Sequence, residues 1–185
     1  MNFRSPHLLD RNSSALLVVD IQEKLIPAIE SSDRVVAKSK QLMDAAAILG
    51  VPVLVSEQYP KGLGATVEAL DVSQAAVVAE KTMFSCRECK SILEFLESKS
   101  IETLLICGIE AHVCVAQSAF DFLASGFNVH VAVDAIGSRN AIDRDTAISR
   151  MSLHGIVTST SEAAIFEWCE SASASEFKQV SQLVK

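Results

Sequence analysis

The sequence predicts an α/β protein in which helices cover both faces of a parallel, six-stranded sheet, giving three layers. Short apolar runs rich in Val, Leu and Ile recur along the chain, as in strands that are buried on both faces. Segments with apolar residues at helical spacing separate these runs. Strand and helix alternate almost to the end of the chain, which is typical of a right-handed, doubly wound sheet.

Each predicted strand is a short apolar run bounded by charged or turn-forming residues. The six strands are residues 15–20, 51–55, 75–80, 102–107, 128–133 and 155–158. The first run stops at Asp20, the third at Glu80 and Lys81, and the fifth at Asp134. Polar groups therefore gather where the predicted strands end.

The predicted helices carry apolar stripes, and the first of them ends at Gly50, a residue typical of helix ends. They cover residues 34–49, 87–99, 114–125, 144–154, 162–169 and a last segment from about 175. The chain shows no internal repeat, low-complexity tract or linker. We therefore expect one domain over residues 1–185.

Composition excludes several function classes. The chain has 16 Lys and Arg against 23 Asp and Glu, a net charge of −7, which argues against a nucleic-acid partner. No apolar run approaches the roughly 20 residues of a membrane span, and the N-terminus lacks the pattern of a secretory leader. The chain has five cysteines, an odd number, and a domain of this size needs no disulfide bonds for stability. We therefore expect reduced thiols in a cytoplasmic protein.

Three chemically capable residues follow predicted strands. Asp20 ends the first, Lys81 follows the third, and Cys114 lies just beyond the fourth. Ligands of open α/β sheets bind outside the carboxyl ends of the strands, so these side chains are expected to converge. They supply a nucleophile, a carboxylate that takes its proton, and a cation that stabilises thiolate and orients the carboxylate.

Cys114 is the candidate nucleophile because it lies at a strand-to-helix junction. The N–H groups and positive dipole end of a first helical turn favour thiolate over thiol. Each residue also has a structural interpretation. A free cysteine is often a packed, inert core residue, an Asp after a strand often forms a turn, and a lone Lys is often a solvated charge.

Three segments carry a family resemblance: LLVVDIQ (16–22), EKTMFS (80–85) and CGIEAHVCV (107–115). They resemble, in order and spacing, the signature blocks of the isochorismatase-like cysteine hydrolases, whose fold is Rossmann-like. The resemblance implies a triad of Asp20, Lys81 and Cys114 and a cis peptide between Ile109 and Glu110. It also implies an oxyanion hole made by the backbone amides of Glu110 and Cys114.

The expected reaction is hydrolysis of a small molecule, at an amide or related C–N bond, through a thioester on Cys114. No cofactor is expected. Self-association into a homo-oligomer, a dimer or larger, is expected as well. The alternative is a catalytically silent member of the fold that serves as an oligomerisation or partner-binding module.

Differences from two related families narrow the range of expected reactions. Nicotinamidases of the superfamily bind a metal through an Asp-x-His arrangement in the loop where this chain has Glu57-Gln58-Tyr59, so we expect no metal site. Isochorismatases that cleave a vinyl ether typically lack the cysteine. The loop EQYPKGLG (57–64) instead resembles the isochorismatase domain-containing branch, whose substrates are generally unsettled.

Five further residues are assigned to substrate binding: Gln22, Tyr59, Phe84, Ile109 and His112. Gln22 has a loop hydrogen bond as its alternative role, Tyr59 a subunit contact, and Phe84 core packing. His112 also has a general-base role as an alternative.

Cys86 and Cys89 form a lone C-x-x-C without a second pair of ligands at zinc spacing. We expect them to be ordinary thiols.

Overall fold

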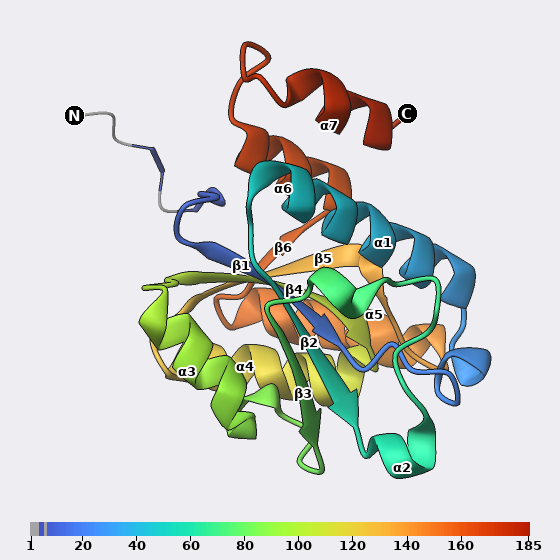
Figure 1. Cartoon of the computed structure of the whole chain (residues 1–185). Coiled ribbons are helices and arrows are strands. Elements are labelled where there is room, and N and C mark those ends of the chain that lie inside the picture. Colours follow the sequence, from blue (N-terminus) through green and yellow to red (C-terminus); the bar gives the residue numbers. More distant parts are fainter. Residues whose placement is uncertain (1–3, 6) are drawn as a thin grey trace.

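A computed structural model describes residues 4–5 and 7–185, and it confirms the predicted fold class (Figure 1). All pairings in the six-stranded sheet are parallel, in the order β3-β2-β1-β4-β5-β6. The strands are β1 (Ser14–Val19), β2 (Val53–Gln58), β3 (Val77–Lys81), β4 (Thr103–Ile109), β5 (Asn128–Gly137) and β6 (Val157–Ser159). The prediction of a single domain over residues 1–185 stays a prediction.

Helices cover both faces of this sheet (Figure 1). One face carries α1 (Ser32–Leu49), α6 (Ser161–Cys169) and α7 (Phe177–Leu183). The other carries α3 (Lys90–Ser98), α4 (Ala116–Ala124) and α5 (Ala141–Leu153). Each predicted helix is therefore present.

The sheet separates two apolar cores, because successive side chains of a strand point to opposite faces. In β1, Leu16 and Val18 pack in the core beneath α1 and α6, whereas Leu17 and Val19 pack beneath α3 and α4. Every residue of β1 is buried. This two-sided burial explains why the strand reads as a continuous apolar run in the sequence.

The direction in which the sheet is built reverses between β1 and β4. From β1 the chain adds β2 and β3 on one side, and then crosses to β4, β5 and β6 on the other. In such sheets the crevice for a ligand lies beyond the carboxyl ends of the strands that flank the reversal. Asp20 directly follows β1, and Cys114 comes five residues after β4.

Short elements differ from the sequence prediction. The structure adds α2 (Pro60–Leu63) and 3-10 turns at Ile26–Ala28, Val72–Gln74 and Cys86–Glu88. The helix expected from Cys114 is preceded by a π turn over Ala111–Val115, and α4 begins only at Ala116. The N–H of Val115 donates to the carbonyl oxygen of Glu110, five residues back, which widens the turn.

His130, in β5, gives the fold a sensitivity to acid. The imidazole is buried, and neither ring nitrogen has a hydrogen-bond partner among residues 4–5 and 7–185. Burial, with a smaller contribution from His7, lowers the pKa of His130 to about 4. The folded state thus binds this proton less readily than the unfolded chain. Above about pH 6.5 His130 does not reduce the free energy of unfolding. As the pH falls from there toward 4, protonation of His130 in the unfolded chain lowers that free energy.

We therefore expect the free energy of unfolding to fall by about 2 kcal/mol between pH 7.5 and pH 5.0 through His130 alone. Urea unfolding at the two pH values measures the difference, and His130→Leu should remove that part of it. His154→Leu replaces a surface histidine and is the control. An equal pH dependence in wild type and His130→Leu would contradict this account.

Candidate active site

Asp20 leaves the sheet as soon as β1 ends. Its φ is 53°, in the left-handed region that Asp tolerates better than most residues. Its N–H donates to the Ser56 carbonyl oxygen of the neighbouring strand at 3.1 Å, and its own carbonyl accepts from the N–H of Gln22 at 2.8 Å. The chain turns sharply here, so the carboxylate stays at the carboxyl edge of the sheet and is fully buried.

Each oxygen of this carboxylate has a donor. Lys81 Nζ lies 2.6 Å from Asp20 Oδ2, and Ser56 Oγ donates to Asp20 Oδ1 at 2.7 Å. The ammonium also donates to Oε1 of Gln58 at 2.7 Å. Both members of the ion pair are almost completely shielded from solvent. Paired and hydrogen-bonded in this way, the two charges are tolerated inside the protein.

Cys114 lies in the π turn, next to this ion pair. Only 7% of the surface of Cys114 is exposed. The thiol is close enough to Asp20 and Lys81 for each to act on its ionisation, and it acts in turn on that of Asp20. The structure thus brings Asp20, Lys81 and Cys114 together from the ends of three different strands.

Opposing effects set the ionisation of the pair. Burial raises the pKa of Asp20, and this outweighs the lowering by the Lys81 charge and by hydrogen bonds from Ser56 and Cys114. Burial disfavours the charged form of Lys81, but the negative groups around it, Asp20 foremost, leave its pKa raised. Lys81 therefore keeps its proton, while Asp20 can gain and lose one closer to neutral pH.

Cys114 differs from the sequence prediction in its resting state. Burial and then the charge of Asp20 raise the pKa of its thiol, and Lys81 only partly opposes them. The expectation that a helix N-terminus would favour thiolate is wrong, because the residue lies in a buried π turn that precedes α4. The protonated thiol is therefore favoured at rest, and the Asp20 carboxylate lies beside it.

Gly108 allows β4 to pass close to β1. Its φ is 119°, and a Cβ at this position would lie 2.1 Å from the backbone oxygen of Val19. The pairing of β4 with β5 also shifts register between Ile106 and Gly108. The next peptide bond, Ile109-Glu110, is cis. Gly108 thus permits the close contact between the end of β4 and β1.

Glu110 immediately precedes the π turn. Its carbonyl oxygen accepts from the N–H groups of Val113 and Val115, at 3.0 and 3.2 Å, on either side of Cys114. Its buried carboxylate pairs with Arg139 at 2.8 Å, while the guanidinium side remains largely exposed. The Glu110 and Cys114 amides, predicted to form an oxyanion hole, thus lie directly before and within one short turn.

Two of the predicted substrate contacts are wrong. The amide of Gln22 is fully buried, and its Nε2 donates to the carbonyl oxygens of Gln58 and Gly64 at 3.0 and 2.7 Å. Its Oε1 accepts from the N–H of Gln58 at 2.7 Å. The Gln22 side chain therefore holds together the two ends of the segment from Gln58 to Gly64. The side chain of Ile109 is fully buried in the core beneath α1, on the opposite face of the sheet from Cys114.

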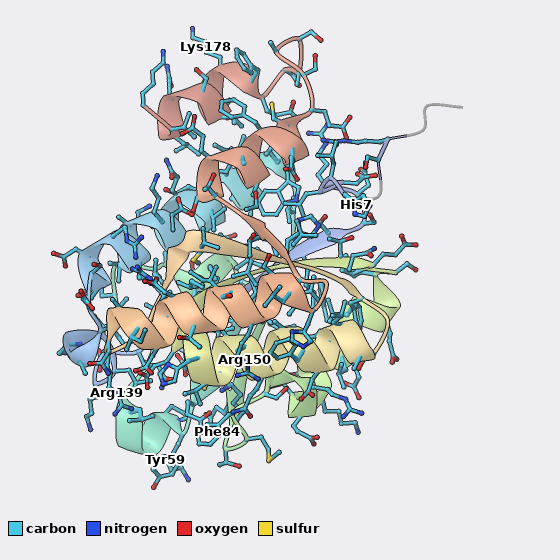
Figure 2. All side chains as sticks on the ribbon, turned by 180° about the vertical axis from the view of Figure 1, so that it is seen from behind. His7, Tyr59, Phe84, Arg139, Arg150 and Lys178 are labelled. Carbon is cyan, nitrogen blue, oxygen red and sulfur yellow. The ribbon has the colours of Figure 1, made fainter. Side chains whose placement is uncertain are left out.

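The other three predicted contacts lie nearer the surface. Tyr59 and Phe84 are 54% and 52% exposed. Phe84 therefore lies at the surface and does not pack in the core. His112 Nδ1 is 3.0 Å from Oγ of Ser138. Figure 2 shows Tyr59, Phe84 and Arg139 at the end of the molecule that carries α2, the end toward which the strands point.

An open cavity of about 380 Å³ lies beside Lys81 at this end. Tyr59, Pro60, Lys61, Glu80 and Thr82 complete its lining, and Cys114 is not among the lining residues. Tyr59 therefore borders a hollow beside the edge strand β3.

Sequence reasoning missed Ser56 and Gln58, which contact Asp20 and Lys81. Both lie in β2, two residues apart and therefore on the same face of the strand. Polar residues at this spacing, at the carboxyl end of a run that is otherwise apolar, were the available signal. Cys86 and Arg139 were not predictable as site neighbours, because only the fold brings them near.

The loop that holds a metal in nicotinamidases is used differently here. Oε1 of Glu57 accepts from the N–H and the hydroxyl of Thr66, at 2.7 and 2.8 Å. Glu57 therefore binds Thr66 across this loop. Within residues 4–5 and 7–185, no three His, Cys, Asp or Glu side chains gather as metal ligands. In the same described part of the chain, no helix is long and apolar enough to cross a membrane.

Comparison with known proteins places the chain in the isochorismatase family. The model of the isochorismatase domain matches residues 14–163, which include Asp20, Lys81 and Cys114. The chain is 38% identical over 166 residues to isochorismatase domain-containing protein 1 of Salmo salar, covering 90% of this chain and 59% of that protein. It is 37% identical over 174 residues to isochorismatase domain-containing protein 2A of Mus musculus, covering 94% and 83%.

Solved structures share the whole fold. The MAR1 ribonuclease structure from Caenorhabditis elegans superposes with a TM-score of 0.89 at 40% identity, covering 96% of this chain and 92% of that one. The YcaC gene product of Escherichia coli, an octameric hydrolase of unknown specificity, gives 0.89 at 25% identity, covering 98% and 91%. This chain belongs to the isochorismatase family, and it spans about three fifths of the length of its Salmo salar relative.

The close approach at Gly108 gives a test of how the site is built. Gly108→Ala should destabilise the protein by about 2 kcal/mol or more, because the new methyl group meets the backbone of Val19, next to Asp20. Urea unfolding measures this loss. The control is Gly126→Ala, also at positive φ but with no atom within 4 Å of the added Cβ, where about 1 kcal/mol is expected. Equal losses in the two variants would refute the steric argument.

Proposed function

We propose that this chain is a cysteine-dependent hydrolase that cleaves an amide or related C–N bond of a small molecule. The observation that carries the proposal is the buried Asp20 carboxylate, which pairs with Lys81 at 2.6 Å and adjoins the Cys114 thiol. A thiol with a raised pKa is a poor nucleophile by itself, and a base in contact with it corrects this.

In the first step, Asp20 accepts the proton of Cys114. The sulfur forms a bond to the carbonyl carbon of the substrate, and the π electrons of the carbonyl move to its oxygen. The backbone N–H groups of Glu110 and Cys114 would donate to that oxyanion. Lys81 stays protonated throughout and offsets the negative charge that Asp20 carries before the transfer and regains afterwards.

In the second step, the tetrahedral intermediate collapses and the C–N bond breaks. The leaving nitrogen takes the proton from Asp20, which leaves an acyl group on the sulfur as a thioester. Asp20 then accepts a proton from water as the water oxygen attacks the thioester carbon. The carboxylic acid product departs, and the proton returns from Asp20 to Cys114. The raised pKa of Asp20 supports this alternation between base and acid.

We also propose that the protein forms a homo-oligomer, is cytoplasmic and works without a cofactor. Val78 on the edge strand β3, and Met83 and Phe84 just beyond it, expose 45%, 55% and 52% of their surfaces. Apolar side chains gathered at one edge of a sheet favour association. The octameric YcaC structure from Escherichia coli is a precedent. The five free, buried cysteines fit a reducing compartment.

A second candidate comes from the ribonuclease name of the Caenorhabditis elegans structure. The net charge of −7 disfavours a polyanionic substrate. The buried position of Cys114 favours a small one. Incubation with a labelled RNA, alongside the small-molecule panel, separates these two candidates.

The test is a panel of small amides, carbamoyl compounds and esters, assayed with wild type and site variants. Cys114→Ala and Asp20→Asn should each lower kcat/KM by about 10³-fold or more on any substrate found, since each removes a group on which bond formation depends. Cys169→Ala replaces a buried cysteine of α6, on the other face of the sheet, and should keep wild-type activity.

Full hydrolytic activity in Cys114→Ala would exclude the thioester route. A protein that turns over no compound of the panel, and whose Cys114 reacts with iodoacetamide no differently from the other four thiols, would favour the silent binding module.

A further inference from the structure

A line of buried hydrogen bonds runs from the C-x-x-C segment to the candidate base. Cys86 Sγ donates to Ser56 Oγ at 3.3 Å, and Ser56 Oγ donates to Asp20 Oδ1 at 2.7 Å. All three side chains are completely buried. The two contacts join a 3-10 turn, strand β2 and the end of β1, which are far apart in the sequence.

The order of donors in this line follows from the chemistry of a hydroxyl group. Ser56 has one hydrogen to donate and lone pairs to accept with. When the Cys86 thiol donates to the Ser56 oxygen, the Ser56 hydrogen is directed to the carboxylate. The other carboxylate oxygen, Oδ2, is already paired with Lys81. Ser56 thus donates the hydrogen bond to the carboxylate oxygen of Asp20 that does not pair with Lys81.

The first cysteine is itself held in place. Its backbone N–H donates to Oγ of Ser118, a buried residue of α4, at 2.8 Å. The 3-10 turn that contains Cys86 therefore rests on the helix that follows the π turn of Cys114. Any shift of this turn changes the contact with Ser56.

We propose that Ser56 is a positioning residue for Asp20, and that Cys86 acts behind it by fixing the direction in which the Ser56 hydroxyl donates. This inference rests on the proposed function, because the base that it concerns is the one that would activate Cys114. It assigns a role to the first thiol of the C-x-x-C, which the sequence analysis treated as ordinary.

The consequence is a controlled affinity of Asp20 for protons. The groups that face its carboxylate are Lys81 from β3, Cys114 from the π turn, and the Ser56 hydroxyl, with Cys86 behind it. Donation from Ser56 favours the ionised carboxylate and opposes the effect of burial. Loss of the hydroxyl should therefore raise the pH at which Asp20 takes up its proton.

The experiment is a carboxyl-selective ¹³C NMR titration of Asp20 in the full chain, with its signal assigned by its absence in Asp20→Asn. Ser56→Ala should move the midpoint upward by about one pH unit. Cys86→Ala should move it in the same direction by less, and Cys86→Ser, which retains a donor, should restore the wild-type midpoint. The matched control is Ser14→Ala, since Ser14 is a buried β1 serine whose hydroxyl has no partner in the part of the chain that the structure describes.

The inference is overturned if Ser56→Ala leaves the Asp20 midpoint within the error of the wild-type titration, or if Ser14→Ala moves it equally. If Ser56→Ala does not fold, Cys86→Ala decides alone: an unchanged midpoint in that variant overturns the inference.

A parallel measurement separates this inference from the proposed function. The rate at which iodoacetamide alkylates Cys114 is followed against pH by mass spectrometry in the same variants. A shifted Asp20 midpoint with a shifted alkylation profile supports both proposals. A shifted midpoint with an unchanged profile supports the role of Ser56 and argues against Asp20 as the base for Cys114.

Discussion

The ion pair between Asp20 and Lys81 is the constraint on which the rest of the site depends. A carboxylate and an ammonium are taken almost entirely out of water, which costs several kcal/mol per ion before their attraction is counted. Each charge is tolerated only while the other, and the hydrogen bonds from Ser56 and to Gln58, remain in place. The carboxyl edge of the sheet must therefore keep its geometry closely.

The backbone around this pair meets that requirement. Asp20 turns out of β1 through a left-handed conformation, and Gly108 lets β4 approach so closely that no other side chain fits. Gln22 ties the loop after β2 to the loop after β1 with all of its amide groups in use. These features lie at the ends of neighbouring strands. They hold a thiol, a carboxylate and an ammonium in one dry volume, where each changes the ionisation of the others.

Much of this was predictable because burial on both faces of a sheet leaves a direct trace in the sequence. The apolar runs of β1 and β4 located the strands, their alternation with helices indicated a doubly wound parallel sheet, and the carboxyl-end rule predicted that Asp20, Lys81 and Cys114 converge. The resting state of Cys114 was not predictable, since it depends on burial and on charges from distant segments. The loop hydrogen bonds of Gln22 were an alternative that the sequence offered, whereas the contact of Cys86 with Ser56 joins segments that only the folded chain brings near. The burial of Ile109 beneath α1 was predictable, because Leu105, Cys107 and Ile109 alternate along β4 and therefore point to the same face of the sheet.

The central claim is that Asp20 and Cys114 are electrostatically coupled inside one site. The most direct test is to titrate the Cys114 thiol through its alkylation rate in wild type and in Asp20→Asn. Because the Asp20 charge raises the thiol pKa, the account predicts that Asp20→Asn lowers this pKa and yet strongly reduces hydrolysis, since the base is gone. A Cys114 pKa that is the same in both proteins would contradict the account.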